Sequence, residues 1–279
     1  MNKILYEDIY DKDNQFSFWK NWQQFLSTLN EDKLQEARNY LSKFIGWEEV
    51  IKDKTIVDFW CWSGLMSLCF ILLWAKKVLS VDIDDSSIEC AKFLRKKYDI
   101  SEDIWEIRKW SILDKQFVSS LWTFDIVYSW GVIHHSWDMW RGLSNICTLV
   151  KDKQLLYVAL YNKFDWFPSS NLWFKIKKYY SQSNSIIKRL LEFVYMTEII
   201  LMRILRWHNP ISYIREYFAN SNRWMDFYTD IKDWLGWYPY EFASIKEVES
   251  FYAEKWFKLI NLYDLSYGTW CNEFLFQKL

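Results

Sequence analysis

Residues 55 to 85 constrain the fold of this chain more than any other stretch. A β-branched apolar run ends at Asp58, a turn and an apolar helix-like run follow, and a second apolar run ends at Asp82. Two strand-like runs that end in acids on either side of a turn and a helix predict a nucleotide-binding unit. Such a loop normally carries glycine where this sequence has Trp60 and Trp62. What the chain does depends on how this conflict is resolved.

The stretch from 51 to 160 alternates strand-like and helix-like runs. Strands are predicted at 55–60, 77–83, 105–109, 124–130 and 154–160, and helices at 63–73, 86–97, 113–121 and 138–150. This alternation predicts an α/β fold with a Rossmann-like, doubly wound, mostly parallel sheet, whose ligand cleft lies at the carboxyl ends of the strands. A helix at 247–255 and strands at 257–266 and 272–277 predict a C-terminal antiparallel hairpin that makes the sheet seven-stranded.

Four parts of the chain follow from this pattern. We expect an N-terminal helical cap, a core that binds the nucleotide-like ligand, a helical insertion after the fifth strand, and a C-terminal helix with its hairpin that completes the core. These parts span 1–50, 51–160, 161–245 and 246–279. An insertion at the end of the fifth strand is where a cover over a substrate would lie.

The composition is unusual in its 20 tryptophans and 6 glycines among 279 residues. Glycine is about 2% of the chain, whereas about 7% is usual. Because some bacteria read the codon UGA as glycine, a translation that reads it as tryptophan would produce this pattern. We therefore hypothesise that twelve tryptophans at turns and helix ends are glycines in the native protein. They are Trp60, Trp62, Trp74, Trp110, Trp122, Trp137, Trp166, Trp207, Trp224, Trp237, Trp256 and Trp270.

Other tryptophans stand in contexts that suit an aromatic side chain, and we expect them to be genuine. They are Trp22, Trp105, Trp130, Trp140, Trp173 and Trp234.

Charge and cysteine content narrow the class of protein. A formal net charge of -1 gives no field that attracts polyanions, so nucleic acid is not an expected partner. The five cysteines are scattered and lack the spacing of a metal site, which predicts reduced thiols, no metal and a cytoplasmic protein. Residues 1–13 mix acids among their apolar residues and lack the apolar run of a signal peptide, so export is not expected. The apolar run 186–205 is interrupted by charges, as in an amphipathic helix, and predicts at most a weak contact with a membrane surface. The oligomeric state stays open.

The loop sequence Asp58-Phe59-Trp60-Cys61-Trp62-Ser63-Gly64 resembles the first motif of the class I S-adenosylmethionine (SAM)-dependent methyltransferases. The resemblance covers 50–160 and the terminal hairpin, and is closest to the small-molecule branch that includes quinone-biosynthesis methylases. It implies that SAM is the cofactor and that the loop backbone runs against it, where a side chain at 60 or 62 would collide. The cofactor-binding residues that it implies are Asp58, Trp60, Cys61, Trp62, Ser63, Gly64, Asp82, Ile83, Ser111 and Ser129.

Asp82 is the candidate for binding the ribose hydroxyl groups of the cofactor. An acid at this place also occurs in NAD-binding folds, but Leu65 stands where an NAD loop has its third glycine. Ser111, or else Asp114, would contact the adenine, although a plain turn explains both residues equally well.

The exit of the fourth strand carries two histidines, His134 and His135. Either could be a general base with a pKa near the working pH, and His135 is preferred. The alternative is that one histidine packs under the loop and the other caps the next helix. Tyr161 and Asn162 after the fifth strand could orient the acceptor, or could simply form a turn.

These residues predict a SAM-dependent methyltransferase that moves a methyl group to a small-molecule acceptor whose nucleophile is O, N or C. One alternative is a catalytically inactive binding module whose cofactor site is plugged by Trp60 and Trp62. Another is a peripheral membrane enzyme that uses 186–205 to reach a lipid-like acceptor.

Overall fold

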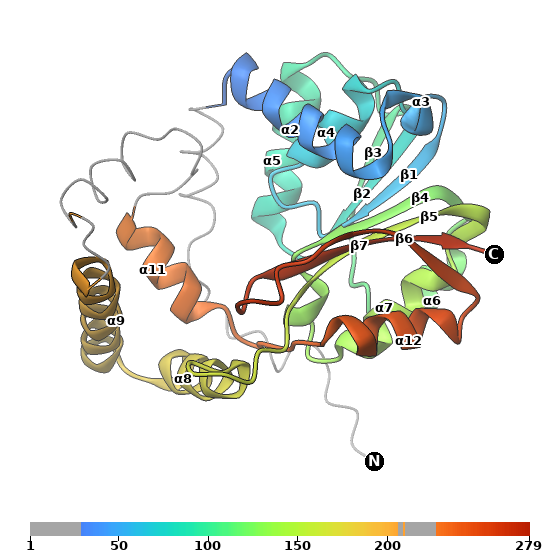
Figure 1. Cartoon of the computed structure of the whole chain (residues 1–279). Helices are drawn as coiled ribbons and strands as arrows, with labels where there is room; N and C mark the ends of the chain where they lie inside the picture. The colour runs from blue at the N-terminus through green and yellow to red at the C-terminus, as the bar shows by residue number, and fades with distance from the viewer. Residues whose placement is uncertain (1–28, 206–208, 210–226) are drawn as a thin grey trace.

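The computed structural model describes residues 29–205, 209 and 227–279. The strands form one seven-stranded sheet in the order β3-β2-β1-β4-β5-β7-β6 (Figure 1). β1 to β5 run parallel, and β7 lies antiparallel between β5 and β6. The predicted fold class is therefore confirmed. The strands are β1 Thr55–Phe59, β2 Lys77–Asp82, β3 Trp105–Lys109, β4 Phe124–Trp130, β5 Val150–Tyr161, β6 Phe257–Tyr263 and β7 Cys271–Lys278.

Helices cover both faces of the sheet (Figure 1). On β1, Ile56 packs into the core on the side of α4, while its neighbour Val57 packs into the core on the opposite side. This alternation of two buried faces explains why the strand sequences are continuously apolar. One face carries α2 Glu31–Ile45, α4 Leu65–Leu72 and α5 Asp85–Lys97, and the other carries α6 Lys115–Ser120, α7 Met139–Cys147 and α12 Ile245–Ala253, while the short α3 Glu48–Ile51 precedes β1.

Two strand boundaries differ from the prediction by more than one residue. β5 begins at Val150 rather than at 154, because the polar residues 151–154 join the strand although they break the apolar run. β6 ends at Tyr263, three residues before the predicted end at 266, since Asp264 accepts a hydrogen bond from the Ser266 amide (2.7 Å) and starts a turn.

The insertion after β5 forms a separate helical layer, made of α8 Ser170–Gln182, α9 Ser185–Leu205 and α11 Phe227–Gly236 (Figure 1). It has its own apolar core, which includes Trp173, Leu235 and Tyr240. Tyr161, at the end of β5, belongs to the same core. The insertion is thus packed onto the edge of the sheet where the strands end.

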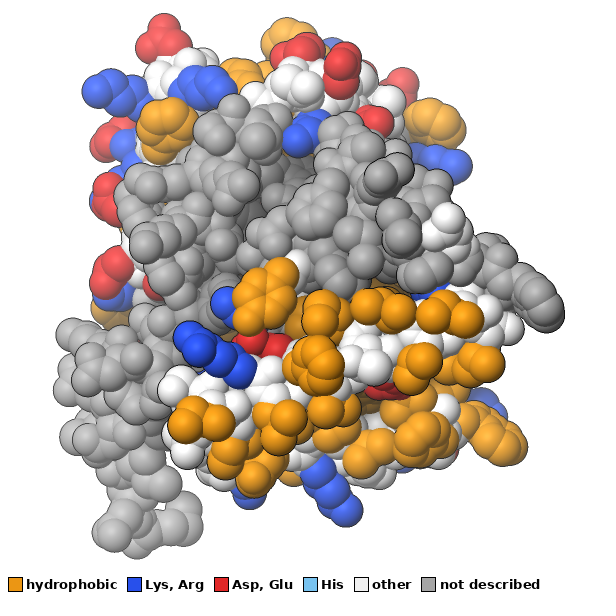
Figure 2. Space-filling view, turned by 90° about the vertical axis from the view of Figure 1, so that its left-hand side faces the viewer, with side chains coloured by type: hydrophobic (Ala, Val, Ile, Leu, Met, Phe, Trp, Pro, Cys, Tyr) orange, Lys and Arg blue, Asp and Glu red, His pale blue; other side chains and the backbone are white. Residues whose placement is uncertain are grey.

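Helix α9 corresponds to the amphipathic stretch predicted at 186–205. Figure 2 shows hydrophobic side chains gathered on the molecular face where this helix lies. In the part of the chain that the structure describes, no helix is both long and apolar enough to cross a membrane. The exposed apolar residues of α9 are Ile186, Leu190, Phe193, Val194, Leu201, Met202, Ile204 and Leu205.

Several tryptophans have a backbone conformation that favours glycine. Among the described residues, the non-glycine residues with positive φ are Asp53, Asp99, Lys153 and six tryptophans. The left-handed region costs an L-residue about 1–2 kcal/mol. The six tryptophans, with φ between 52° and 77°, are Trp47, Trp60, Trp62, Trp74, Trp137 and Trp256.

Five of these six were among the twelve glycine candidates, whereas Trp47 was missed. With φ 77° and ψ 174°, Trp47 lies in a region that is essentially restricted to glycine. The backbone of the remaining described candidates has no positive φ and does not itself demand glycine; these are Trp110, Trp122, Trp166, Trp237 and Trp270. Trp207, Trp224 and Trp22 lie outside the described residues.

Candidate functional site

The loop between β1 and α4 is folded tightly at the carboxyl edge of the sheet. Its backbone alternates into the left-handed region at Trp60, Trp62 and Gly64, with φ of 66°, 52° and 78°. A Cβ at Gly64 would lie 2.9 Å from the Cβ of Ala91, so the contact with α5 requires glycine there. The Gly64 amide donates to the Cys61 carbonyl (2.7 Å), which closes the turn over the buried Cys61 and Ser63.

Asp58, at the end of β1, is buried beneath this loop. Its Oδ2 accepts a hydrogen bond from Ser67 Oγ (2.6 Å), which in turn contacts Ser80 Oγ (2.6 Å). The indole N–H of Trp105 donates to the same Ser80 oxygen (2.7 Å), as suits a genuine tryptophan. Burial raises the pKa of Asp58 to about 7. The carboxyl group is therefore poised to ionise when a cation or a hydrogen-bond donor approaches.

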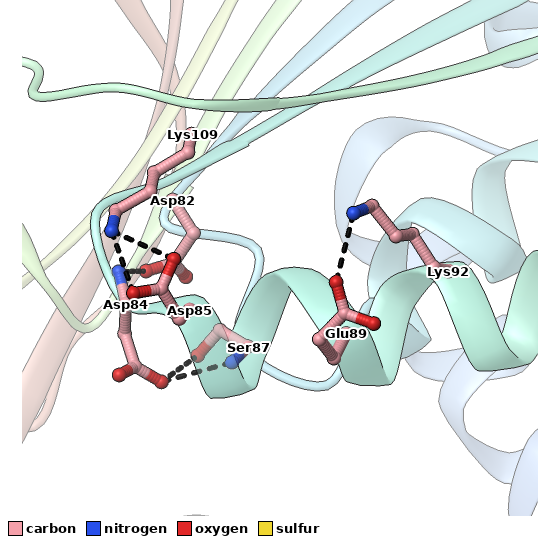
Figure 3. A network of polar contacts seen from close by, with 7 residues as sticks. All are labelled: Asp82, Asp84, Asp85, Ser87, Glu89, Lys92 and Lys109. Carbon is pink, nitrogen blue, oxygen red and sulfur yellow. Dashed lines mark hydrogen bonds and ion pairs between the residues drawn. The ribbon is translucent and has the colours of Figure 1, made fainter.

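Asp82, at the end of β2, holds the loop from the other side. Its Oδ2 accepts the Trp62 amide (3.0 Å) and its Oδ1 accepts the Asp84 amide (2.9 Å), as Figure 3 shows for Asp84. Burial raises the pKa of Asp82 to about 8, although both amides act in the opposite direction. Ile83 follows directly, and Asp84 caps α5 by accepting a hydrogen bond from the Ser87 amide.

The turn after β3 holds the residues predicted to contact adenine. Ser111 Oγ accepts the Leu113 amide (3.2 Å). Asp114 caps α6 and accepts the amides of Gln116 (2.9 Å) and Phe117 (3.1 Å). Both side chains are thus engaged in forming the turn, which is the simpler of the two interpretations.

The exit of β4 brings the histidine pair to the same edge. Ser129 is buried, and its Oγ lies 3.4 Å from the Phe59 carbonyl. The ring of His134 lies 4.4 Å from that of His135 and 4.0 Å from that of Tyr161. Tyr161 and the histidines therefore form one cluster below the insertion.

The hydrogen bonds of the two histidines define their tautomers. His134 Nδ1 accepts the Tyr161 amide (3.3 Å), so the proton of its neutral ring lies on Nε2. His135 Nδ1 faces the Pro239 carbonyl (2.6 Å) and must donate to it, which leaves Nε2 of His135 as a free acceptor. His135 Nε2 is accordingly the atom able to take a proton from a substrate.

Neither histidine has a pKa near neutrality in this structure, which corrects the sequence-based expectation. Burial lowers the pKa of His135 to about 3, and the charge of Lys177 also lowers it. Burial lowers the pKa of His134 well below its usual value, and the nearby His135 and Lys177 act in the same direction. Both rings are neutral at physiological pH because an apolar surrounding disfavours the imidazolium ion.

Asn162 does not join the histidine cluster. Its side-chain amide donates to the carbonyls of Gly268 (2.8 Å) and Ser266 (3.2 Å), and its Oδ1 accepts from Asn272 (3.0 Å). Its side-chain hydrogen bonds therefore hold the turn between β6 and β7 and the start of β7. Of the two residues predicted to orient the acceptor, the structure brings only Tyr161 to the histidines.

Lys177 on α8 was not among the residues predicted for the site. Its side chain is fully buried, and Nζ donates to the Trp234 carbonyl and lies 3.8 Å from the centre of the Trp234 ring. The spacing of Trp173, Lys177 and Tyr180 places all three on one helix face, and that pattern is the signal that could have revealed a buried lysine. No group of His, Cys, Asp and Glu in the described ranges could hold a metal ion.

No protein-family model matches the chain. A short stretch is similar to ribosomal protein L11 methyltransferases. The one from Colwellia psychrerythraea is 38% identical over 52 residues, and the one from Psychrobacter is 35% identical over 54 residues. Each match covers 19% of this chain and 18% of the relative, so the chain matches less than a fifth of the relative's length.

Solved structures resemble the chain over a much greater length. Magnesium protoporphyrin IX methyltransferase (ChlM) from Synechocystis, solved with bound SAM, matches with a TM-score of 0.56 and 9% identity over 100% of both chains. PKMT2 from Rickettsia typhi, in complex with AdoHcy, matches with a TM-score of 0.55 and 15% identity over 87% of this chain and 52% of that one. The loop at Asp58, the acid at Asp82 and the strand order agree with this likeness. The chain therefore has the fold of the class I SAM-dependent methyltransferases.

Proposed function

We propose that this protein is a SAM-dependent methyltransferase that acts on a small-molecule acceptor. The observation that carries the proposal is the conformation of the loop from Asp58 to Gly64. Its backbone is left-handed at positions 60, 62 and 64, and the amide of residue 62 donates a hydrogen bond to the Asp82 carboxylate. Two structures of the same fold, ChlM and PKMT2, were solved with SAM and AdoHcy bound. Three residues with positive φ in one five-residue stretch make a backbone surface that a ligand can approach closely, provided that no side chain covers it.

The residues fit SAM if positions 60 and 62 are glycine. Asp82 would accept hydrogen bonds from the ribose hydroxyl groups, and burial raises the pKa of this carboxyl although backbone amides already donate to it. The backbone from Ser129 to Gly131 would line the methionine end. In the chain with tryptophan at both positions, the indoles of Trp60 and Trp62 would lie where the cofactor approaches the loop. We therefore expect this form of the chain to bind SAM weakly or not at all.

SAM would supply the methyl group, and the protein would orient the acceptor and exclude water from the reacting atoms. His134 and Tyr161 are buried and His135 is partly buried, so an acceptor bound beside them would be largely separated from water and held for in-line attack. His135 Nε2 would accept the acceptor's proton, since its Nδ1 already donates to Pro239. His134 and Tyr161 would position the acceptor from the same cluster.

The small size of the acceptor is proposed from the burial of Tyr161 and His134. The L11 methyltransferases act on a protein, as their name says, but the match to them spans 18% of their length. We further propose a cytoplasmic location, supported by cysteines that are all free of disulfides in the described residues, and a weak membrane contact through α9.

Isothermal titration with SAM tests the proposal. We compare the printed chain with the Trp60→Gly/Trp62→Gly form, and use Trp122→Gly/Trp166→Gly as a matched control with two exchanges away from the loop. We expect micromolar binding only when 60 and 62 are glycine. Absence of binding by that form, while it remains folded, would refute the proposal.

The plugged binding module is tested on the native protein. Peptide mass spectrometry reads the residues at 60 and 62 directly. Glycine masses would support the enzyme, whereas tryptophan masses together with no SAM binding would favour the plugged module.

A further inference from the structure

Residues 239–243 form a return segment that carries the chain from the end of α11 back to the start of α12 (Figure 1). Its last residue pairs with the end of β5. The Ala243 amide donates to the Tyr161 carbonyl (3.0 Å), and the Lys163 amide donates to the Ala243 carbonyl (3.1 Å). The return segment is therefore fixed to the edge of the sheet where the histidine cluster lies.

The return segment also contacts the exit of β4 at three points. The Pro239 carbonyl accepts a hydrogen bond from His135 Nδ1 (2.6 Å). The Glu241 amide donates to the His134 carbonyl (2.9 Å). The Glu241 carboxyl group accepts the Met139 amide, which lies 3.2 Å from Oε1 and 3.0 Å from Oε2. Glu241 thus holds the backbone on both sides of His135.

The Met139 amide needs a partner from outside its own helix. Met139 is the first residue of α7, and the first amides of a helix have no acceptor within it. The capping residue Asp138 accepts the Arg141 amide (3.2 Å), so the Met139 amide is left to Glu241. A carboxyl group is a suitable partner because the N-terminus of a helix favours negative charge. Glu241 is partly buried, and its side chain therefore has a specific place on α7.

The Pro239 contact decides which nitrogen of the His135 ring carries the proton. Because a carbonyl oxygen only accepts, Nδ1 carries the proton and Nε2 keeps its lone pair. Proline has no amide hydrogen with which to anchor its own backbone. Two residues span at most about 7 Å, so a displacement of Glu241 is passed on to Pro239. The position of this carbonyl therefore depends on the contacts of Glu241.

We propose that Glu241 is a positioning residue: by joining the return segment to the backbone on both sides of His135, it keeps the Pro239 carbonyl on Nδ1 and leaves Nε2 free to accept a proton. The inference rests on the proposed function, since it is there that His135 Nε2 accepts the proton of the acceptor. It does not depend on the residues at the twelve glycine candidates, because none of them takes part in these contacts.

Glu247 provides a matched control for a purely structural role. Like Glu241, it is a glutamate whose side chain accepts a backbone amide at the start of a helix, here that of Ser244 (2.8 Å) before α12. Its other contact is an ion pair with Lys163 (3.6 Å), and so it does not hold the backbone around His135. Removing the Glu247 side chain should destabilise the protein without changing the His135 ring.

Nuclear magnetic resonance (NMR) of the native protein, labelled with nitrogen-15 at its three histidines, tests the inference. Protonated and unprotonated ring nitrogens give distinct signals. At about pH 8, where imidazoles are neutral, the spectrum therefore gives the ratio of the Nδ1–H to the Nε2–H tautomer. A His135→Gln variant identifies the His135 signals. The forms compared are the native protein, Glu241→Ala, Glu241→Gln and Glu247→Ala.

We expect His135 to carry its proton mainly on Nδ1 in the native protein and in Glu247→Ala. Glu241→Ala should lower the tautomer ratio about three- to tenfold, the effect of losing one hydrogen bond. Glu241→Gln should keep a ratio close to the native one, because its amide oxygen can accept the Met139 amide. If Glu241→Ala does not fold, Glu241→Asp takes its place, since its carboxyl group is one methylene too short to reach Met139.

An unchanged tautomer ratio in Glu241→Ala would overturn the inference, and so would an equal change in Glu247→Ala. An equal loss in Glu241→Gln and Glu241→Ala would also overturn it, because the charge and not the hydrogen bond would then matter. Titration of the same forms with SAM separates the two proposals, since we expect the affinity for SAM to be the same in all of them. If the native protein does not bind SAM, the proposed function fails, whereas the tautomer ratios still decide the role of Glu241.

Discussion

Replacing Trp74 and Trp256 by glycine should raise the free energy of unfolding of the chain that carries tryptophan at these positions. Trp74 ends α4 with φ 65°; its amide donates to the Ile71 carbonyl (2.9 Å) and the next amide donates to the Phe70 carbonyl (3.0 Å). This is the Schellman arrangement, in which glycine normally occupies the left-handed position. Trp256, after α12, also has φ 65°. Both indoles are mostly exposed, at 65% and 74%, so little packing is lost when they are removed.

The expected gain follows from two opposing terms. Relief of the left-handed strain contributes about 1–2 kcal/mol per site. The greater freedom of glycine in the unfolded chain offsets about 0.4–1 kcal/mol of this. The double variant should therefore gain roughly 1–2 kcal/mol in free energy of unfolding, which corresponds to a rise in Tm of about 2–8 °C.

Urea unfolding measures the effect, as a higher midpoint with an unchanged m-value. Trp140→Gly is the matched control, because Trp140 is partly exposed at 37%, lies in helix α7 without positive φ, and packs on Phe251 with ring centres 5.0 Å apart. Glycine in a helix costs about 1 kcal/mol, so this control should lower the midpoint. A double variant that loses as much stability as the control would refute the assignment of strain to Trp74 and Trp256.

The remaining predictions concern ligand binding. In the form with glycine at 60 and 62, Asp82→Asn should weaken SAM binding at least about tenfold, since the amide replaces a charged acceptor; unchanged affinity would exclude Asp82 from the ribose site. Burial raises the folded-state pKa of Asp58 to about 7 and that of Asp82 to about 8, so both carboxyl groups are largely protonated at pH 6. Because the charged carboxylates bind the cofactor better, the affinity for SAM should rise from pH 6 to pH 9. An affinity that does not change with pH in calorimetry would contradict this. Leu190→Glu/Phe193→Glu should abolish flotation with anionic liposomes, and a parent protein that never floats would end the proposal of a membrane contact.

The sheet was predictable because its strands are buried on both sides. Runs such as 55–59 and 77–82 are continuously apolar and alternate with helical patterns, and this alternation leaves few topologies. Ends of strands were less predictable, as at Val150, because pairing with a neighbouring strand can extend a strand into polar sequence. Trp47 escaped notice because two consecutive residues with positive φ, Gly46 and Trp47, leave no periodic signal.

Only those site residues were predictable that lie at the carboxyl ends of the parallel strands, because the order of strands and helices along the chain already brings these ends together. Asp58, Gly64 and Asp82 follow from strands that end at one edge, and so does the histidine pair. The contacts of the insertion were not predictable, since Lys177 and Trp237 reach the cluster through the packing of α8 and α11 onto Tyr161. The low pKa of His135 has the same origin, because desolvation depends on what the insertion covers.

The hydrogen-bonded chain from Trp105 through Ser80 and Ser67 to Asp58 also has a spectroscopic consequence. If the twelve glycine candidates are indeed glycine, eight of the 20 tryptophans remain, and Trp105 is a fully buried one that is connected to Asp58, at the floor of the loop, by three contacts. Ionisation of Asp58 when a cationic ligand arrives would change the field at its N–H. Trp105 fluorescence is thus expected to report occupancy of the loop in the native protein, against a background from the other tryptophans that is lower than in the form with all 20.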